Sequence, residues 1–393
     1  MKKIITALLA GLLAAGSALA LDVEVSGEIK TGFFAEWREM KGESASYARI
    51  YNSDGDSGAA EGRIRLGLAL QEENFGMRTR FYRQEFKAKN NKFDSSSNIG
   101  VDFAYAYGTM LDNQIKISAG LLGESPWGTG GPDLIKELET TGNDPILGIR
   151  TEWKPLGFLR GLNLGFVLNR DNDTPPSSAK EKFGDIFAET VAGIAYEHDF
   201  FALRFAYRFN RELESPAAIV NGSQLVYRVE ERALEKFVPG ISVWANGYCK
   251  GIGAKVINSQ GATETFIQNW FYARYDPENF TVGIDVRYED WFEDKDNKQF
   301  LEIRPSFYYK LFNNILNVGV RGGMEFGFNN GRYFREGAVY NFWFVEPQIK
   351  ANLKSNFYTA LVYRYTSGYY TGNPSFEEDQ ETHWFNLRVC FTF

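Results

Sequence analysis

Basic residues recur on one side of several short segments of this sequence, and apolar residues occupy the other side. Cations repeated along one side of an extended segment form a charged surface that attracts anions, repels cations and orients polar solutes. Such a surface could select ions or small molecules. The basic residues that follow this pattern are Lys30, Arg63, Arg65, Arg78, Arg80, Lys116, Arg150, Arg204 and Arg208.

The segment 123–145 carries the opposite charge. Lys136 is its only basic residue, whereas its carboxylates are Glu124, Asp133, Glu137, Glu139 and Asp144. Pro132 and Asp133 suit the first turn of a short helix. If this segment faced the basic residues across a narrow passage, the two sets would create a transverse electric field that acts on passing ions.

A second interpretation of the basic residues remains open. They could solvate a wide aqueous interior, or pair along its wall with nearby carboxylates. The candidate carboxylate partners are Glu28, Asp102, Glu152, Asp285, Glu289 and Glu302.

The segments that carry these residues have a period of two. In 201–209 and 280–289, every second residue is apolar, which predicts strands with one apolar and one polar face. The same unit repeats along the chain as two strands joined by a short turn, followed by a longer polar loop. The eighteen predicted strands are 22–37, 60–71, 75–88, 99–110, 114–122, 146–154, 161–169, 185–197, 200–211, 222–232, 239–251, 263–276, 279–292, 298–311, 315–329, 338–353, 357–369 and 380–393. The period is least clear in 222–251, and without that hairpin the count is sixteen.

The start of the sequence predicts export. Met1, Lys2 and Lys3 precede an apolar run over 4–15, and Ala18-Leu19-Ala20 is a small-x-small cleavage site. This is the pattern of a signal peptide over 1–20, which leaves a barrel domain over 21–393. No later run of eighteen apolar residues occurs, which excludes a helical membrane protein. Export and strands together predict an all-β, transmembrane, antiparallel up-and-down β-barrel.

The last strand resembles the C-terminal strand of bacterial outer-membrane β-barrels. Apolar residues alternate with polar ones from Phe385 onward, and the strand closes on Phe391 and Phe393. In that family the strand and its final Phe are the signal for the barrel-assembly machinery. The resemblance implies a cell outer-membrane location, with both termini and the short turns in the periplasm and the longer loops outside.

Barrel strands with a long acidic third loop over 123–145 also resemble the general diffusion porins of Gram-negative bacteria. The resemblance implies that the third loop folds into the lumen and that a homotrimer sits in outer-membrane lipid and lipopolysaccharide. It also implies passive diffusion of ions and small polar solutes. The Pro-Glu-Phe-Gly-Gly type motif of that family's loop is absent here. The family has sixteen strands, whereas eighteen, the count here, is typical of sugar-specific porins.

Two alternative functions remain open. A channel selective for sugars or carboxylates would need a track of aromatic rings in the lumen, for which Trp127, Tyr82 and Tyr308 are candidates. Most other aromatic residues are predicted on the lipid side or at strand ends. A non-conducting surface adhesin would need longer external loops than these. The preference between cations and anions is also open.

Other functions find little support. The two histidines, His198 and His383, have no nucleophile at a recognisable spacing, so no enzyme is predicted. No ligand spacing predicts a metal, and no motif predicts a cofactor. Without Lys2 and Lys3, the 43 basic residues fall to 41 against 50 acidic ones, a net charge of −9 that argues against nucleic acid as a partner.

Overall fold

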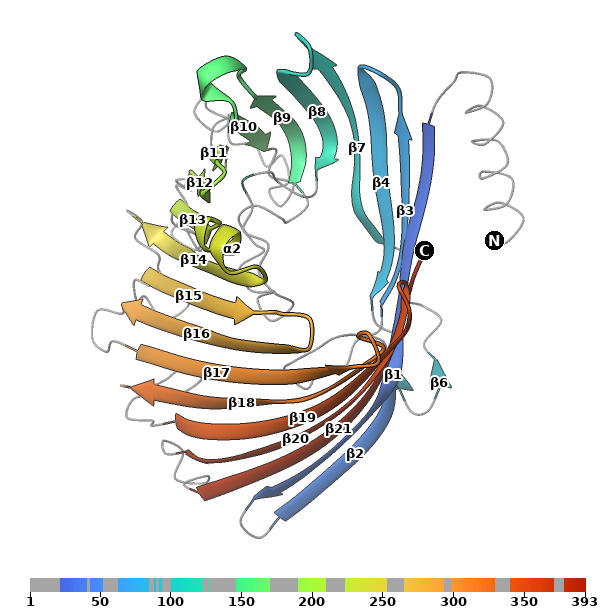
Figure 1. Cartoon of the computed structure of the whole chain (residues 1–393), viewed down its shortest axis with the longest axis vertical. Helices are drawn as coiled ribbons and strands as arrows, with labels where there is room; N and C mark the ends of the chain where they lie inside the picture. The colour runs from blue at the N-terminus through green and yellow to red at the C-terminus, as the bar shows by residue number, and fades with distance from the viewer. Residues whose placement is uncertain are drawn as a thin grey trace, which may run out of the picture.

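The alternating segments form long antiparallel strands in the computed structural model of the chain (Figure 1). The structure describes residues 22–40, 43–51, 63–84, 88–89, 92–93, 100–122, 127, 146–169, 190–209, 223–252, 265–292, 298–328, 340–370 and 378–393. The predicted signal peptide over 1–20 lies outside these ranges. The strands are β1 Asp22–Met40, β2 Glu43–Tyr51, β3 Arg63–Gln71, β4 Phe75–Gln84, β5 Ala88–Lys89, β6 Lys92–Phe93, β7 Gly100–Met110, β8 Ile115–Leu122, β9 Ile146–Trp153, β10 Leu162–Asn169, β11 Val191–Glu197, β12 Phe201–Arg208, β13 Ser223–Glu231, β14 Ile241–Ile252, β15 Thr265–Tyr275, β16 Phe280–Phe292, β17 Lys298–Leu311, β18 Leu316–Phe328, β19 Tyr340–Lys354, β20 Phe357–Tyr370 and β21 Glu378–Thr392.

Strand β1 closes the sheet into a barrel. On one side it pairs with β21, from Glu28 opposite Thr392 to Met40 opposite Gln380. On its other side, its first half pairs with β3 and its second half with β2. Because β2 and β3 follow one another along the same edge, they fill one position in the ring. The described strands therefore make a closed, all-antiparallel barrel of eighteen positions, which confirms the larger of the two predicted counts.

The segment over 222–251 is a hairpin, as the eighteen-strand count requires. Strands β13 and β14 pair in register from Gln224 opposite Lys250 to Glu231 opposite Val243. The blurred period comes from the connection between them, which contains the short helix α2 (Ala233–Phe237). A helical turn has a period near 3.6, so it interrupts the period of two without ending the sheet.

Between the predicted strands 22–37 and 60–71 the sequence predicted a polar loop, and that prediction is wrong in its first part. Strand β1 continues to Met40, and residues 43–51 return as β2. The sequence Glu-Ser-Ala-Ser-Tyr-Ala-Arg-Ile-Tyr lacks a clear apolar alternation, which is why the strand was not predicted. Pairing with the second half of β1 supplies the backbone hydrogen bonds that hold it.

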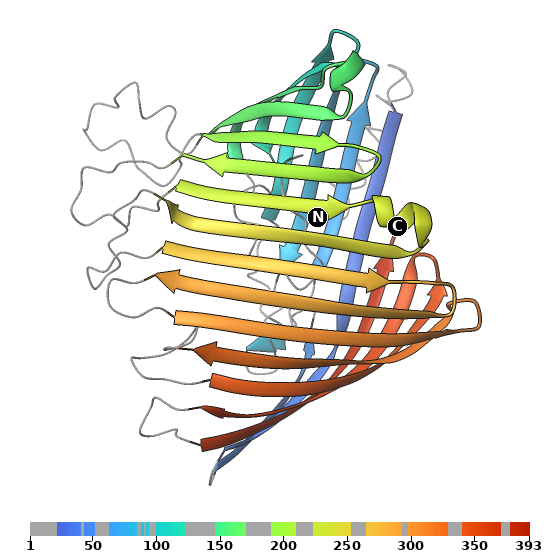
Figure 2. The same ribbon diagram turned by 60° about the vertical axis from the view of Figure 1, so that its left-hand side comes forward.

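The two ends of the barrel differ in their connections. At one end the strands are joined by short connections such as 72–74, 198–200 and 276–279, and α2 lies at this end (Figure 2). We call it the short-turn end. Strand β1 begins and β21 finishes there, and the chain's last backbone groups pair with Gly27. The longer connections, including 123–145, leave from the opposite end.

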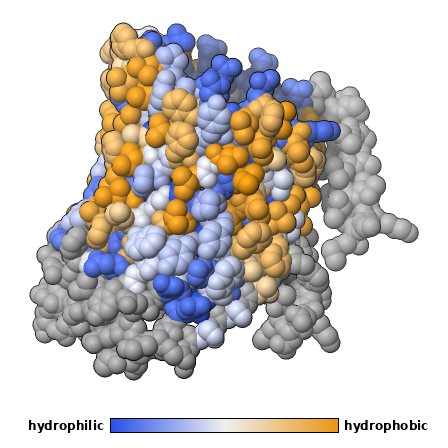
Figure 3. All heavy atoms as spheres, turned by 60° about the horizontal axis from the view of Figure 1, so that its bottom comes forward, coloured by the Kyte–Doolittle hydropathy of each residue, from blue (hydrophilic) through white to orange (hydrophobic). Residues whose placement is uncertain are grey.

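The outer face of the wall is apolar. Its exposed side chains include Val25, Ile29 and Phe33 on β1 and Phe205 on β12, and apolar side chains cover much of the face shown in Figure 3. Residues at the intervening positions face the interior of the barrel. Within the described ranges, no helix is long and apolar enough to cross a membrane.

One short turn is held by an ion-pair cluster. Asp276 follows β15, and its carboxylate lies 2.6 Å from Lys310 Nζ and 2.8 Å from Arg274 Nη2. The Thr281 hydroxyl also donates to it. Burial acts to raise the pKa of Asp276, but the hydrogen bonds from Lys310 and Thr281 and the nearby Arg274 outweigh it, so the pKa lies below its usual 3.8.

We expect the substitution Asp276→Asn to lower the free energy of unfolding by about 1 kcal/mol at neutral pH, because a half-exposed ion pair contributes little more. A depressed pKa stabilises the folded state above the unfolded-state pKa and loses that contribution as pH falls through the folded pKa. The difference between wild type and variant should therefore be constant above pH 5 and shrink below about pH 4. Urea unfolding of refolded protein across this pH range measures it, and a difference that grows in acid would contradict the assignment.

Candidate functional site: the inner wall

Strand alternation places most of the predicted basic residues on the inner face. Each has at least one neighbour along its strand that is exposed on the outer face, which places these cations at inward positions: Lys30, Arg65, Arg78, Arg80, Lys116, Arg150 and Arg204. Arg63 and Arg208 lie in β3 and β12, but their side chains, like that of Asp102, lie outside what the structure describes. Those of the predicted cations that the structure describes all come from strands on one half of the ring, between β1 and β12.

The predicted acidic partners cannot be placed against this wall. Glu124, Asp133, Glu137, Glu139 and Asp144 all lie outside the described residues. Trp127 is the one residue of 123–145 that the structure describes. It is therefore the one point of that segment that can be placed in the barrel.

Trp127 is fully buried against the inner face of β10 and β11. Its indole Nε1 donates to the backbone carbonyl of Asn163 at 3.2 Å. Gly165 and Gly193 are directly opposite each other on the two strands, and a Cβ on either would meet the indole ring. Because neither glycine has a side chain, the two together leave a notch in the wall, and the indole ring fills it. Inward residues of β7, β10, β11 and β12 complete the apolar cluster around it.

Three aromatic rings follow one another along β7, each beneath a cation from a different strand. The Arg80 guanidinium lies 4.6 Å from the Phe103 ring centre, and Lys116 Nζ lies 4.4 Å from that of Tyr107. Arg150 lies 5.7 Å from the Tyr105 ring. Aromatic faces attract cations through their quadrupole, so the rings fix the heads of these long side chains.

On β16 and β17, cations and carboxylates of the inner wall form a buried network. Arg287 pairs with Glu289 on its own strand and lies 3.9 Å from Glu302 on the next, which also binds Arg304. Arg287 is at the same time 4.8 Å from the ring of Trp270. Buried charges of this kind are tolerated only when paired, so the network holds these side chains in place rather than offering free charges.

A second network links β18, β19 and β20. Glu346 accepts Arg321 on one oxygen at 2.7 Å and Arg364 on the other at 2.5 Å. Arg364 lies between the rings of Phe344 and Trp384, at 4.3 and 4.7 Å from their centres. On this half of the wall, each paired arginine therefore contacts a carboxylate, and most also lie against an aromatic ring of a nearby strand.

Some of the predicted cations form ion pairs with carboxylates of the same wall, as the second interpretation of the sequence allowed. Arg150 Nε lies 3.0 Å from Glu152, and Lys30 Nζ lies 3.5 Å from Glu28. Arg78 differs from them, because it is exposed to the interior and has no ion-pair partner among the described residues. Among the cations described on this half of the ring, Arg78 is thus available to act on a passing ion.

Among the described residues, most aromatic side chains do face outward or lie at strand ends, as predicted, but the inward set is larger than the three predicted candidates. Many rings occupy inward positions: Phe34, Phe103, Tyr105, Tyr107, Trp244, Tyr248, Trp270, Tyr272, Phe300, Phe342, Phe344 and Trp384. The sequence reasoning also missed Arg228, Arg287, Arg304, Arg321 and Arg364, most of which lie against these rings. Arg287 and Arg364 lie directly opposite the inward Trp270 and Trp384 on a neighbouring strand, so a cross-strand pair of Arg and Trp was the available signal.

The histidines lie apart from the inner wall's charges. His383 faces outward, where its ring stacks on Trp37 and its Nδ1 lies 2.8 Å from the Tyr363 hydroxyl. His198 lies in a short turn. Within the described ranges, no group of three or more His, Cys, Asp or Glu side chains could hold a metal ion.

No family model and no curated protein sequence matches this chain. Solved structures match it in fold. The anion-selective porin from Comamonas acidovorans has a TM-score of 0.54 at 12% identity, over 94% of this chain and 100% of that one. OpdQ of Pseudomonas aeruginosa has a TM-score of 0.53 at 10% identity, over 95% and 98%. The outer-membrane channel DcaP of Acinetobacter baumannii has 0.51 at 11%, over 95% and 97%. The chain therefore has the barrel fold of outer-membrane porins and channels.

The notch predicts a specific coupling between Gly193 and Trp127. We expect Gly193→Ala to lower the free energy of unfolding by about 1–3 kcal/mol, because the new methyl group overlaps a ring that is buried on all sides. Trp127→Ala should cost about 3–5 kcal/mol by leaving a cavity. In the double variant the alanine methyl meets no ring. The stability lost in the double variant should therefore be smaller than the sum of the losses in the two single variants.

Urea unfolding of the refolded variants gives this double-mutant cycle. Gly283→Ala, on the inner face of β16, is the matched control, since the nearest atom is a Ser306 hydroxyl that can rotate away. Strictly additive losses at Gly193 and Trp127 would contradict the notch.

Proposed function

We propose that this protein is an outer-membrane porin that allows passive diffusion of ions and small polar solutes. The observation that carries the proposal is the closed ring of eighteen strands with an apolar outer face and a charged inner face. Only a closed barrel satisfies every backbone hydrogen bond in lipid, and eighteen strands enclose an aqueous channel. The likeness in fold to an anion-selective porin and to an outer-membrane channel supports it.

We further propose that the segment 123–145 narrows the lumen. Trp127, near its start, already lies against the inner wall. From there, Glu124, Asp133, Glu137, Glu139 and Asp144 would face cations of the inner wall and create the transverse field described above. Net selectivity then depends on whether the loop carboxylates or exposed wall cations such as Arg78 dominate.

The proposed function places the molecule in the cell envelope. The signal peptide over 1–20 directs export, and the short-turn end faces the periplasm, so both ends of the mature chain lie there. The apolar wall contacts outer-membrane lipid and lipopolysaccharide, and three copies form a homotrimer. Phe391 and Phe393 serve as the signal for the barrel-assembly machinery.

A channel selective for sugars or carboxylates is the second candidate. The observation that favours it is the set of inward aromatic rings that lie against arginines, as at Arg364 between Phe344 and Trp384. Rings of this kind bind the apolar faces of sugars, and arginines bind carboxylates. Reduction of single-channel current by added sugars or carboxylates, compared with uncharged polyols of equal size, distinguishes it from general diffusion.

We expect purified, refolded protein to produce stepwise conductance in planar bilayers, with a reversal potential under a KCl gradient that reports its ion preference. The substitution Arg78→Gln should shift that potential toward cation preference, because it removes an exposed inward charge. Lys354→Gln, at the exposed last residue of β19 at the short-turn end, is the matched control and should shift it less. Folded protein that inserts but never conducts would exclude a diffusion pore and favour a plugged barrel or a surface adhesin.

The proposed assembly signal predicts a difference between cells and refolding. The Phe393 ring is half-exposed on the outer face, stacked on Phe391 at 5.9 Å between ring centres. It therefore contributes little to the folded wall. We expect Phe393→Ala to reduce the assembled protein in outer-membrane fractions severalfold, while urea unfolding of refolded variant protein changes by less than about 1 kcal/mol. Equal amounts of wild type and variant in the membrane would refute the signal.

A further inference from the structure

A cavity of about 630 Å³ lies at the short-turn end, lined by residues of β10, β11 and β12 and of the turns that precede β8 and follow β9. Its volume is within the range of sites that hold small molecules. Lys154, Arg160 and Arg204 contribute cations to its lining, and Asn163 and Gln114 contribute amides. Glu197 and Asp112 are its carboxylates. The cavity adjoins the Trp127 notch, since Asn163 belongs to both.

Asn163 is the buried polar group of this cavity. Its side chain is only 8% exposed, and its Nδ2 donates to Glu152 Oε2 at 3.3 Å. That bond fixes the orientation of the amide, because a carboxylate can only accept. The amide oxygen Oδ1 is left buried with no hydrogen-bond partner among the described residues. A buried acceptor without a donor is costly, so a bound molecule that donates an O–H or N–H at this point would be favoured.

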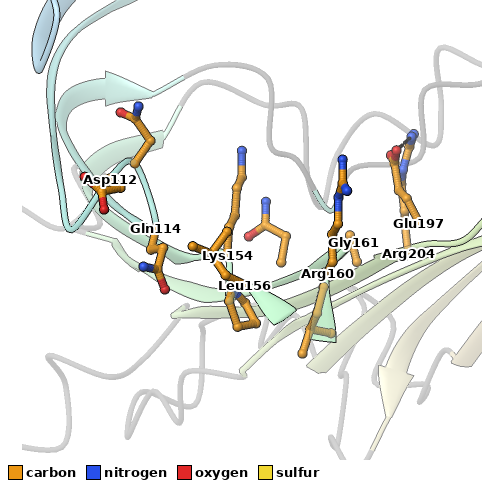
Figure 4. A pocket seen from close by; sticks show the side chains of 13 residues that line it. Asp112, Gln114, Lys154, Leu156, Arg160, Gly161, Glu197 and Arg204 are labelled. Atoms are coloured by element: carbon orange, nitrogen blue, oxygen red, sulfur yellow. Dashed lines mark hydrogen bonds and ion pairs between the residues drawn. The ribbon is translucent and has the colours of Figure 1, made fainter. Parts of the chain in front are cut away.

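Two of the three cations are available to an anion. Arg204 is engaged by Glu197 at 3.1 Å, and Arg232 also lies 3.8 Å from that carboxylate. Lys154 is half-exposed, with Nζ 4.0 Å from Glu152. Arg160 is exposed and has no ion-pair partner within the described ranges. Lys154 and Arg160 extend in the same direction, with the Arg204–Glu197 pair at one end of the cavity and Asp112 at the other (Figure 4).

The cavity floor is built on rigid strands. Asn163, Ala195 and Arg204 are cross-strand neighbours on β10, β11 and β12, so register fixes their spacing. Lys154 and Arg160 flank the short 3-10 turn Gly157–Leu159 that joins β9 to β10. The acceptor thus lies on the wall, and the two cations lie beside it on one connection.

We propose that this cavity binds a small hydroxycarboxylate at the short-turn end of the pore. The carboxylate of the ligand lies between Lys154 and Arg160, and a hydroxyl group of the ligand donates to Asn163 Oδ1. The inference rests on the proposed diffusion function and adds a subsite to it, because a solute that has crossed the barrel meets this cavity at the short-turn mouth. Lys154 and Arg160 attract the carboxylate of the ligand. The Asn163 amide oxygen favours ligands that carry a hydroxyl group over carboxylates that carry none.

Equilibrium dialysis of refolded full-length protein in detergent tests the proposal with two probes. Gluconate and hexanoate have six carbons and one carboxylate each, but only gluconate carries hydroxyl groups. We expect gluconate to bind at least tenfold more tightly than hexanoate. The double variant Lys154→Gln/Arg160→Gln should weaken gluconate binding at least tenfold, and Asn163→Ala should abolish the preference between the probes.

The control variant is Lys236→Gln/Lys354→Gln, which removes the same charge from other exposed positions at the short-turn end and should leave binding within twofold. Because Lys154 and Arg160 are exposed, the charge variants keep the test valid even if Asn163→Ala fails to fold. Equal binding of the two probes by wild-type protein, or gluconate binding that survives loss of both cations, would overturn the subsite.

Bilayer recordings separate this proposal from the function on which it rests. Protein that conducts but binds neither probe overturns the subsite alone. Protein that binds gluconate with the expected dependence on Lys154 and Arg160, but never conducts, supports the cavity and overturns the diffusion function.

Discussion

The pairing of β1 with β21 determines what every other side chain of the barrel does. Successive residues of a strand face opposite sides, so a shift of one residue at this seam would exchange the inner and outer faces of the closing strand. With Glu28 opposite Thr392, Ile29 and Phe33 face outward and Lys30 and Phe34 face inward. The apolar exterior and the charged interior are two consequences of one hydrogen-bonded ring.

The inner wall divides into two regions with different charge arrangements. On β16 to β20, Arg287, Arg304, Arg321 and Arg364 are matched by Glu289, Glu302 and Glu346, and aromatic rings lie against them. Matched, buried charges contribute a stiff surface with little net field. At the short-turn end of β4 to β10, Arg78, Lys154 and Arg160 have no strong carboxylate partner. The unpaired positive charge of the described inner wall therefore lies mainly on that side.

The strands could be predicted because their periodicity is a local property of the sequence. Residues 201–209 alternate cleanly, and β12 spans Phe201–Arg208. Alternation does not reveal a position where both faces are apolar. Trp244 lies between Val243 and Ala245, so the sequence does not show that its ring faces inward against Arg228. The cavity at Asn163 was also beyond prediction, because it depends on the register of three strands and on a turn.

The position of β1 has a mechanical consequence. It is held by β21 from Glu28 onward on one edge, and by β3 and then β2 on the other. A force applied at Asp22 along the strand axis must therefore shear two long ladders at once, whereas a force that peels β21 from β20 opens its bonds one after another. Because β21 is likewise held between β20 and β1, single-molecule pulling along the strand axis should meet high resistance at either end of the barrel, and far less when the force is turned across the strands.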